Sequence, residues 1–200
     1  MKKRITIIAI GEKMAEGYKK DISNFFEDTI EVEASSIDKI EHDKKIETDL
    51  ILISANSIFR LVKPYALVDC EIITINKTLS KKGFEKIKDL PEGTNALLVN
   101  IGPYTAAETI LLLYNIARKD IELYPYYPGI KEYPKLDLAI TPGEKEIVPK
   151  NVKNIIDIGN RVTDVSTILS IITNLKLDKE KYKKKIFEYY NETVPSNYAI

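Results

Sequence analysis

A set of small and polar residues follows short apolar runs and could contact a ligand. These candidate ligand-binding residues are Ser54, Asn56, Ser57, Asn100, Thr141, Gly143, Gly159 and Arg161. Their hydroxyl, amide, backbone N–H and guanidinium groups are suited to hydrogen bonding with a small polar molecule. The same residue types also cap helices and form turns in many proteins, so each has a purely structural alternative.

Arg161 is the most informative member of this set. An arginine in a turn between a strand and a helix can bind a carboxylate or phosphate through two parallel hydrogen bonds. Helix starts near Ser57 and Thr163 would add free N–H groups and a positive dipole end, which also favour an anion. The alternative is an ion pair of Arg161 with Asp157 or Asp164 that fixes the turn, and the sequence leaves both roles open.

The sequence carries no complete catalytic signature. It contains neither the phosphate-binding P-loop motif, G-x-x-x-x-G-K-[ST], nor the G-x-G-x-x-G dinucleotide-binding motif. His42 is the only histidine and lies in a charged stretch, so histidine-dependent nucleophilic catalysis has little basis. Cys70 is the only cysteine and begins an apolar run, so we expect a small core residue. We therefore expect no catalytic residues, no metal ion and no cofactor.

Composition narrows the class of protein. The 30 lysines and arginines balance the 30 aspartates and glutamates, which argues against a nucleic-acid-binding domain. The content of 44% hydrophobic and 30% charged residues is ordinary for a globular chain. No apolar run reaches the ~18–20 residues of a membrane span, and residues 5–10 are too short a run for a signal peptide. We expect a cytoplasmic protein that contacts neither a membrane nor nucleic acid directly.

Short apolar runs alternate with amphipathic stretches along the chain. The predicted strands are residues 5–10, 29–34, 50–53, 70–75, 96–99, 121–124, 136–140 and 154–158. The predicted helices are residues 14–26, 57–62, 80–90, 105–117, 165–175 and 178–190. This alternation predicts a mainly parallel sheet. Because ligands of open α/β sheets bind at the carboxyl ends of strands, the candidate residues stand where a site is expected.

Residues 91–95 combine turn-forming residues with no apolar side chain and separate two such series. We therefore predict an α/β fold with two Rossmann-like lobes, mainly parallel sheets and an interlobe cleft. The lobes would comprise residues 1–90 and 91–177, followed by a C-terminal helix and linker at residues 178–200. A single larger sheet is the alternative.

Three local features carry further expectations. Thr105 and Glu108 have the spacing of a capping box at a helix start. Thr163 or Asp164 should cap the helix that follows. Tyrosines and prolines crowd residues 124–134, where no helix can form. That loop could line a pocket or form a surface that binds a partner protein. Packing of the loop against its own lobe is the slightly favoured alternative.

Several segments resemble a known family. These are SANS at residues 54–57, ALLVNIGPYTAAETILLLYNIA, the YPYYPG loop, and LDLAITPGEKEIVP with IIDIGNRVTDVSTI. They resemble the N-terminal sensory regions of bacterial sigma-54-dependent transcriptional regulators, and are similar in plan to the N-terminal domain of propionate catabolism activators. The resemblance covers most of residues 1–175. It implies a two-lobed effector-binding domain in which the turn at residues 54–57 helps to form the pocket.

The resemblance also implies partners. Members of that family control a downstream ATPase and DNA-binding domain, usually through self-association. Neither part occurs in this sequence, so the chain would be the isolated sensor of a longer regulator or a stand-alone relative. The leading hypothesis is a ligand-sensing regulatory domain, not an enzyme, that binds a small and anionic metabolite between its lobes and forms a homo-oligomer. The alternatives are an enzyme that uses carboxylate acid–base groups in the same cleft, and a pure dimerisation module.

Overall fold

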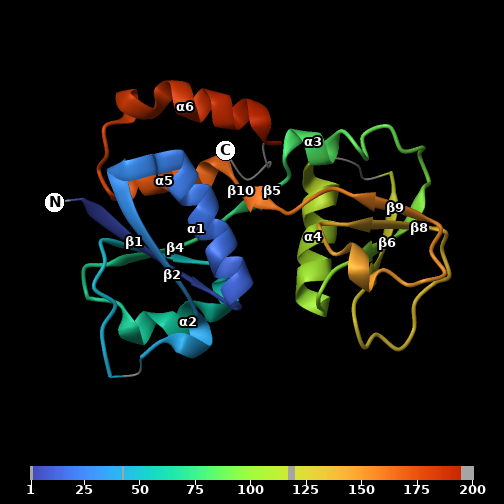
Figure 1. Cartoon of the computed structure of the whole chain (residues 1–200), viewed down its shortest axis with the longest axis horizontal. Helices are drawn as coiled ribbons and strands as arrows, with labels where there is room; N and C mark the ends of the chain where they lie inside the picture. The colour runs from blue at the N-terminus through green and yellow to red at the C-terminus, as the bar shows by residue number, and fades with distance from the viewer. Residues whose placement is uncertain (1, 42, 117–119, 195–200) are drawn as a thin grey trace. The chain divides into compact units, whose positions relative to one another are not determined.

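A computed structural model describes residues 2–41, 43–116 and 120–194 (Figure 1). The described residues form two compact units, and each contains a sheet of four parallel strands. Unit 1 takes its residues from Met1–Lys77 and Thr163–Tyr189, and unit 2 from Thr78–Val162 and Tyr190–Ile200. The predicted α/β fold with two Rossmann-like lobes is confirmed, whereas the interlobe cleft stays a prediction.

The sheet of unit 1 has the strand order β2-β1-β3-β4. Its strands are β1 (Lys3–Ala9), β2 (Ile30–Ser36), β3 (Leu50–Ile53) and β4 (Glu71–Thr74). Ile5 lies opposite Val32 on one side and Leu50 on the other, so β1 is a central strand. The alternating strand β2 lies at the edge of the sheet, as its pattern of apolar and acidic residues indicated.

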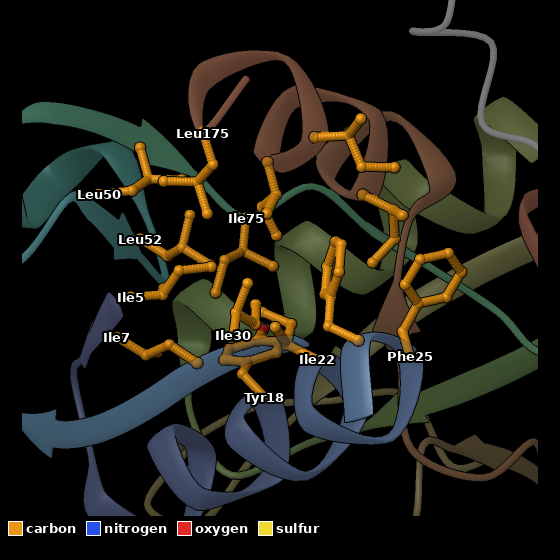
Figure 2. Close-up of a cluster of buried hydrophobic side chains, with 14 of the residues drawn as sticks. Ile5, Ile7, Tyr18, Ile22, Phe25, Ile30, Leu50, Leu52, Ile75 and Leu175 are labelled. Carbon is orange, nitrogen blue, oxygen red and sulfur yellow. The ribbon is translucent and has the colours of Figure 1, made fainter. Parts of the chain in front are cut away.

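Helices cover the two faces of this sheet. They are α1 (Glu12–Phe26), α2 (Phe59–Val62), α5 (Val165–Asn174) and α6 (Lys179–Glu192). Figure 2 shows Tyr18 and Ile22 of α1 packing against Ile5 and Leu52 of the strands, with Leu175 beside them. The opposite face packs against α2 and contains Cys70, which is buried as predicted. Burial of these apolar faces is the main stabilising contribution.

Unit 2 repeats the same strand order, as β7-β6-β8-β9. Its strands are β6 (Asn95–Val99), β7 (Glu122–Tyr126), β8 (Leu138–Thr141) and β9 (Asn154–Asp157). One face packs against α3 (Lys81–Phe84) and α4 (Pro103–Ile116). On the other face Tyr126 meets Tyr133 edge to face at 4.7 Å between ring centroids, over Val99 and Ala139. The tyrosine loop thus packs on its own unit, the favoured alternative.

Several short elements complete the described fold. The 3-10 turns are η1 (Glu27–Thr29), η2 (Ile37–Lys39), η3 (Asn56–Ile58), η4 (Lys63–Tyr65) and η5 (Lys145–Ile147). Strands β5 (Lys77–Thr78) and β10 (Val162–Thr163) pair with each other and were not predicted, since two residues give no periodic signal. Within the described residues, no helix is both long enough and apolar enough to span a bilayer.

Two predictions of local structure need correction. Helix α3 ends at Phe84, and residues 85–89 form consecutive turns instead of the predicted helix to residue 90. Helix α4 begins at Pro103, so Thr105 lies inside the first turn and is not the N-cap of a capping box. Its hydroxyl accepts the N–H of Gly102 at 3.1 Å. Proline is favourable in the first turn because its missing N–H needs no partner there.

The compact units differ from the predicted linear lobes. Leu79 and Ile87 pack into the core of unit 2, and Ile168 packs into the core of unit 1. The polar stretch at residues 91–95 is a surface loop within unit 2, where the Gly93 N–H donates to the carbonyl of Asp120 at 2.8 Å. Turn-forming residues without apolar side chains look the same inside a unit as between units.

Candidate functional site

The candidate residues lie at the carboxyl ends of strands, and most of them are near the point where the strand order reverses. That reversal falls between β1 and β3 in unit 1, and between β6 and β8 in unit 2. Open α/β sheets bind their ligands outside the strand ends at this point. Ser54, Asn56 and Ser57 follow β3, whereas the remaining candidates follow strands of unit 2. Candidates therefore lie near each of the two reversal points, whereas Gly159 and Arg161 follow the edge strand β9.

In unit 1, the residues after β3 mainly hold their own turn. The buried hydroxyl of Ser54 accepts the backbone N–H of Ile10 at 3.2 Å and so ties the ends of β1 and β3 together. The side chain of Asn56 accepts a hydrogen bond from the hydroxyl of Thr74 at the end of β4. Ser57 is exposed, and no hydrogen bond of its hydroxyl to another described residue is found. Of these three side chains, Ser57 is the freest to contact a ligand.

In unit 2, Asn100 is fully occupied by its own turn. Its amide nitrogen donates to the carbonyl of Thr105 and to the hydroxyl of Thr109, each at 3.1 Å. Its amide oxygen accepts the N–H of Ile101 at 2.8 Å. Because the side chain is buried and both ends are bonded, it fixes the start of α4 and has little capacity left for a ligand.

Asp157 organises the loops after β8 and β9. One carboxylate oxygen accepts the N–H of Gly143 at 3.0 Å and that of Gly159 at 2.8 Å. The other oxygen lies 3.4 Å from the Lys145 ammonium. The buried Thr141 hydroxyl accepts the N–H of Glu144 at 3.0 Å, which closes the first loop. The two loops are therefore held together by an internal anion, at a place where the sequence predicted an external one.

Both glycines in this cluster adopt conformations that other residues avoid. Gly143 has φ +95° and Gly159 has φ +74°. A Cβ atom on Gly143 would also lie 2.5 Å from the side-chain oxygen of Asn160. Their backbone shape aims both N–H groups at Asp157. From the sequence, Asp157 is expected only as a partner for Arg161. An aspartate that ends a strand two residues before a glycine is, however, a local signal for a side chain that binds the backbone of its own turn.

The electrostatics of Asp157 suit a permanently charged group. Desolvation raises the pKa of Asp157, but the N–H of Gly159, the Lys145 ammonium and the N–H of Gly143 together hold that pKa below its ordinary value. A general acid or base at neutral pH needs a raised carboxyl pKa. The geometry of Asp157 therefore gives no support to acid–base catalysis by this residue.

Arg161 forms an ion pair that the sequence did not predict. Its Nη1 donates to Oε2 of Glu108 on α4 at 3.0 Å, and its side chain is only 11% exposed. Asp157 is occupied as described, and Asp164 caps α5 by accepting the N–H of Ser166 at 2.8 Å. Of the two roles that the sequence left open for Arg161, the ion pair is present but its partner is Glu108 instead of Asp157 or Asp164, whereas the predicted cap at Asp164 is confirmed. A guanidinium has five N–H donors, so an incoming anion has donors with which to bind Arg161 and can then take the place of this carboxylate.

Two further expectations concern other chemistry. His42 lies outside the described residues. Within residues 2–41, 43–116 and 120–194, no group of three histidine, cysteine, aspartate or glutamate side chains gathers as metal ligands would. Burial raises the pKa of the Cys70 thiol, which keeps it protonated and unreactive at neutral pH.

Comparison of the chain with protein-family models, curated proteins and solved structures gives no match in any of the three. The resemblance to sensory domains of sigma-54-dependent regulators therefore stays a prediction. The contribution of each candidate residue to ligand binding also stays a prediction.

Proposed function

We propose that this chain is a ligand-sensing regulatory domain that binds a small anionic metabolite at the carboxyl edge of the unit 2 sheet. The position of Arg161 carries this proposal. Its side chain is mostly buried in the loop that follows β9, and its guanidinium is held by the carboxylate of Glu108. Burial strengthens the attraction between a guanidinium and an anion, because water screens the charges less.

A ligand anion that replaces Glu108 as the ion-pair partner of Arg161 could transmit the binding event to the rest of the domain. A carboxylate or phosphate that reaches Arg161 competes with Glu108, which is 43% exposed and can be rehydrated when released. Glu108 lies on α4, so ligand binding changes what holds this helix to the loop at Arg161. An equilibrium between two such arrangements shifts by as much as the ligand prefers one of them. Self-association and a downstream ATPase with a DNA-binding domain are the partners we propose for this signal.

A thermal-shift screen tests the proposal. The full chain is heated with small organic acids and phosphorylated metabolites, and a ligand at ~100 times its dissociation constant should add ~2.7 kcal/mol to the free energy of unfolding. Arg161→Gln should reduce the affinity about 10- to 100-fold, as expected for a lost charge-assisted pair. Lys153→Gln is the matched control, because it removes the same charge from an exposed pair with Asp137.

The outcome is decided by the comparison of the two variants. An anion that binds the unchanged chain and the Lys153 variant equally well, but the Arg161 variant weakly, supports the proposal. If no anion shifts the melting temperature, or if Arg161→Gln binds a discovered anion with unchanged affinity, the proposal is wrong.

A further inference from the structure

A depression of about 890 Å³ lies in unit 1, on the face of the sheet opposite the core shown in Figure 2. Its floor includes Arg4 and Thr6 of β1 and Glu33 and Ser35 of β2. Its wall includes residues 39–41 and 43–47, which precede β3. A depression of this size lies within the range that small-molecule sites occupy.

The polar floor is unusual for a parallel sheet. Both faces of such sheets are normally covered by apolar contacts. Ile5 and Ile7 of β1 point into the core, as Figure 2 shows, while Arg4 and Thr6 alternate with them on the opposite face. Arg4 and Thr6 therefore face the depression instead of an apolar layer.

Most charged groups of the wall already have partners. The Lys39 ammonium lies 2.6 Å from Glu12, and the Lys44 ammonium lies 2.6 Å from Glu41. The Lys45 ammonium donates to the carbonyl of Pro64 at 2.6 Å. These three lysines therefore bind groups that are not on the floor of the depression. They do not neutralise the charges of Arg4 and Glu33 on the floor.

Arg4 and Glu33 are the opposite charges on the floor. Neither side chain has a hydrogen bond or ion pair to another of the described residues. The Arg4 charge helps to lower the pKa of Asp49 from a distance, but Asp49 binds the Lys3 ammonium at 2.9 Å. Glu33 lies opposite Thr6 in the register, two residues beyond Arg4 along the strand direction. With ~4.8 Å between neighbouring strands and a rise of ~3.3 Å per residue, such diagonal positions are ~8 Å apart, within reach of long side chains. Glu31 is directly opposite Arg4 but does not line the depression.

We propose that this depression binds a free amino acid, with the ligand carboxylate on Arg4 and its ammonium group on Glu33. Thr6, which also lines the depression, lies opposite Glu33 in the register and two residues after Arg4, and its hydroxyl can accept or donate a further hydrogen bond. Ile8, Ile40 and Ile46 also line the depression and offer apolar contact to the ligand side chain. The site lies in unit 1 and does not depend on the function proposed for Arg161.

Titration calorimetry with the full chain and the standard amino acids tests this site. Each amino acid that binds is compared with its N-acetyl derivative, which lacks the cation, and with its amide, which lacks the anion. Both derivatives should bind at least ten times more weakly. Arg4→Gln and Glu33→Gln should each weaken binding of the parent amino acid at least tenfold, because each removes one charged partner.

Two controls make the test specific. Glu180→Gln removes a carboxylate of unit 1 from an exposed pair with Lys183 on α6, and Arg161→Gln removes the arginine of the other proposed site. Both should leave amino-acid affinity within twofold. Ser35→Tyr should fill the depression and abolish binding without lowering the melting temperature, which covers the case in which the Arg4 variant fails to fold.

Three results would overturn the inference. One is the absence of binding by every amino acid at about 10 mM, beyond the usual millimolar range of weak sites. Another is equal affinity for the amino acid and either of its derivatives. The last is an amino-acid affinity that is unchanged in Ser35→Tyr and also unchanged in either Arg4→Gln or Glu33→Gln.

Discussion

At the scale of single residues, the Asp157 carboxylate occupies backbone N–H groups that were expected to bind an anionic ligand. Asp157 accepts the N–H groups of Gly143 and Gly159, which would otherwise point toward an open position at the strand ends. Backbone N–H groups that converge in this way form a nest for negative charge. Because the chain fills this nest itself, the N–H groups of the two glycines are not available to a ligand, and Arg161 is the better candidate.

We predict that Asp157→Ala destabilises unit 2 by about 2 kcal/mol at neutral pH, because two hydrogen bonds to a charged acceptor are lost. The folded-state pKa of Asp157 is depressed, so its stabilising contribution is present above the ordinary pKa of an aspartate. That contribution is lost as the pH falls through the depressed value. Urea unfolding at pH 7 and at about pH 3 measures the difference between the variant and the unchanged chain.

The stability lost in Asp157→Ala should be largest at pH 7 and should become smaller as the pH is lowered. Asp137→Ala is the control, since its carboxylate pairs with Lys153 on an exposed surface and should change stability little. A deficit in Asp157→Ala that is equally large at both pH values would show that the charge of Asp157 is not the cause.

At the scale of elements, replacing two helical glycines by alanine should change the free energy of unfolding in opposite directions. Gly17 is exposed in the middle of α1, and a Cβ there would meet nothing within 4 Å. Gly17→Ala should therefore stabilise unit 1 by about 1 kcal/mol through helix propensity. A Cβ on Gly83 would lie 2.1 Å from the carbonyl oxygen of Ile158, so Gly83→Ala should destabilise unit 2 by about 1–3 kcal/mol.

Urea unfolding followed by circular dichroism compares the two variants directly. Each serves as the control for the other, because the chemical change is the same in both. A stabilising effect of Gly83→Ala would mean that α3 does not approach the end of β9 as closely as described.

The strands were largely predictable because buried strands of a parallel sheet leave continuous apolar runs. Residues 50–53 were predicted and observed with identical limits as β3. The limits of α3 were not predictable, since residues 80–90 have helical spacing but the helix ends at Phe84. The close approach of Gly83 to the distant Ile158 is a long-range contact that leaves no local signal in the sequence.

The candidate site was predictable in position but not in detail. The residue types at Asn100, Thr141 and Gly143 correctly indicated turns at strand ends. Whether such a residue binds its own backbone or a ligand depends on how the turn closes, which the residue type does not reveal. The pairing of Arg161 with Glu108 joins residues far apart in sequence and could not be inferred from spacing.

At the scale of the whole molecule, unit 1 is built from two separate segments of the chain. The N–H of Asp164 donates to the carbonyl of Asn76, and the N–H of Asn76 donates to the hydroxyl of Thr167, each at 2.8 Å. The two segments therefore run together at the point where the chain leaves unit 1 and returns to it.

We predict that residues 1–77 joined by a short glycine–serine linker to residues 163–192 fold on their own. This chain retains the residues of α1, α5 and α6 that form the core with the strands. Residues 1–90 alone should not fold cooperatively, because Ile168, Ile171 and Ile172 are missing and the face that they cover is exposed. Near-ultraviolet circular dichroism, dye binding and urea unfolding distinguish the two chains. A cooperative transition for residues 1–90 would contradict the division into units.

The order in which segments appear during synthesis gives this division a further consequence. Residues 78–162 leave the ribosome before residues 163–189, so the second half of the chain can begin to fold while the first still lacks α5 and α6. At about 5–20 residues per second, the nascent β1 to β4 segment waits on the order of ten seconds for its covering helices. Its apolar face is the part of the nascent chain that a chaperone would need to shield.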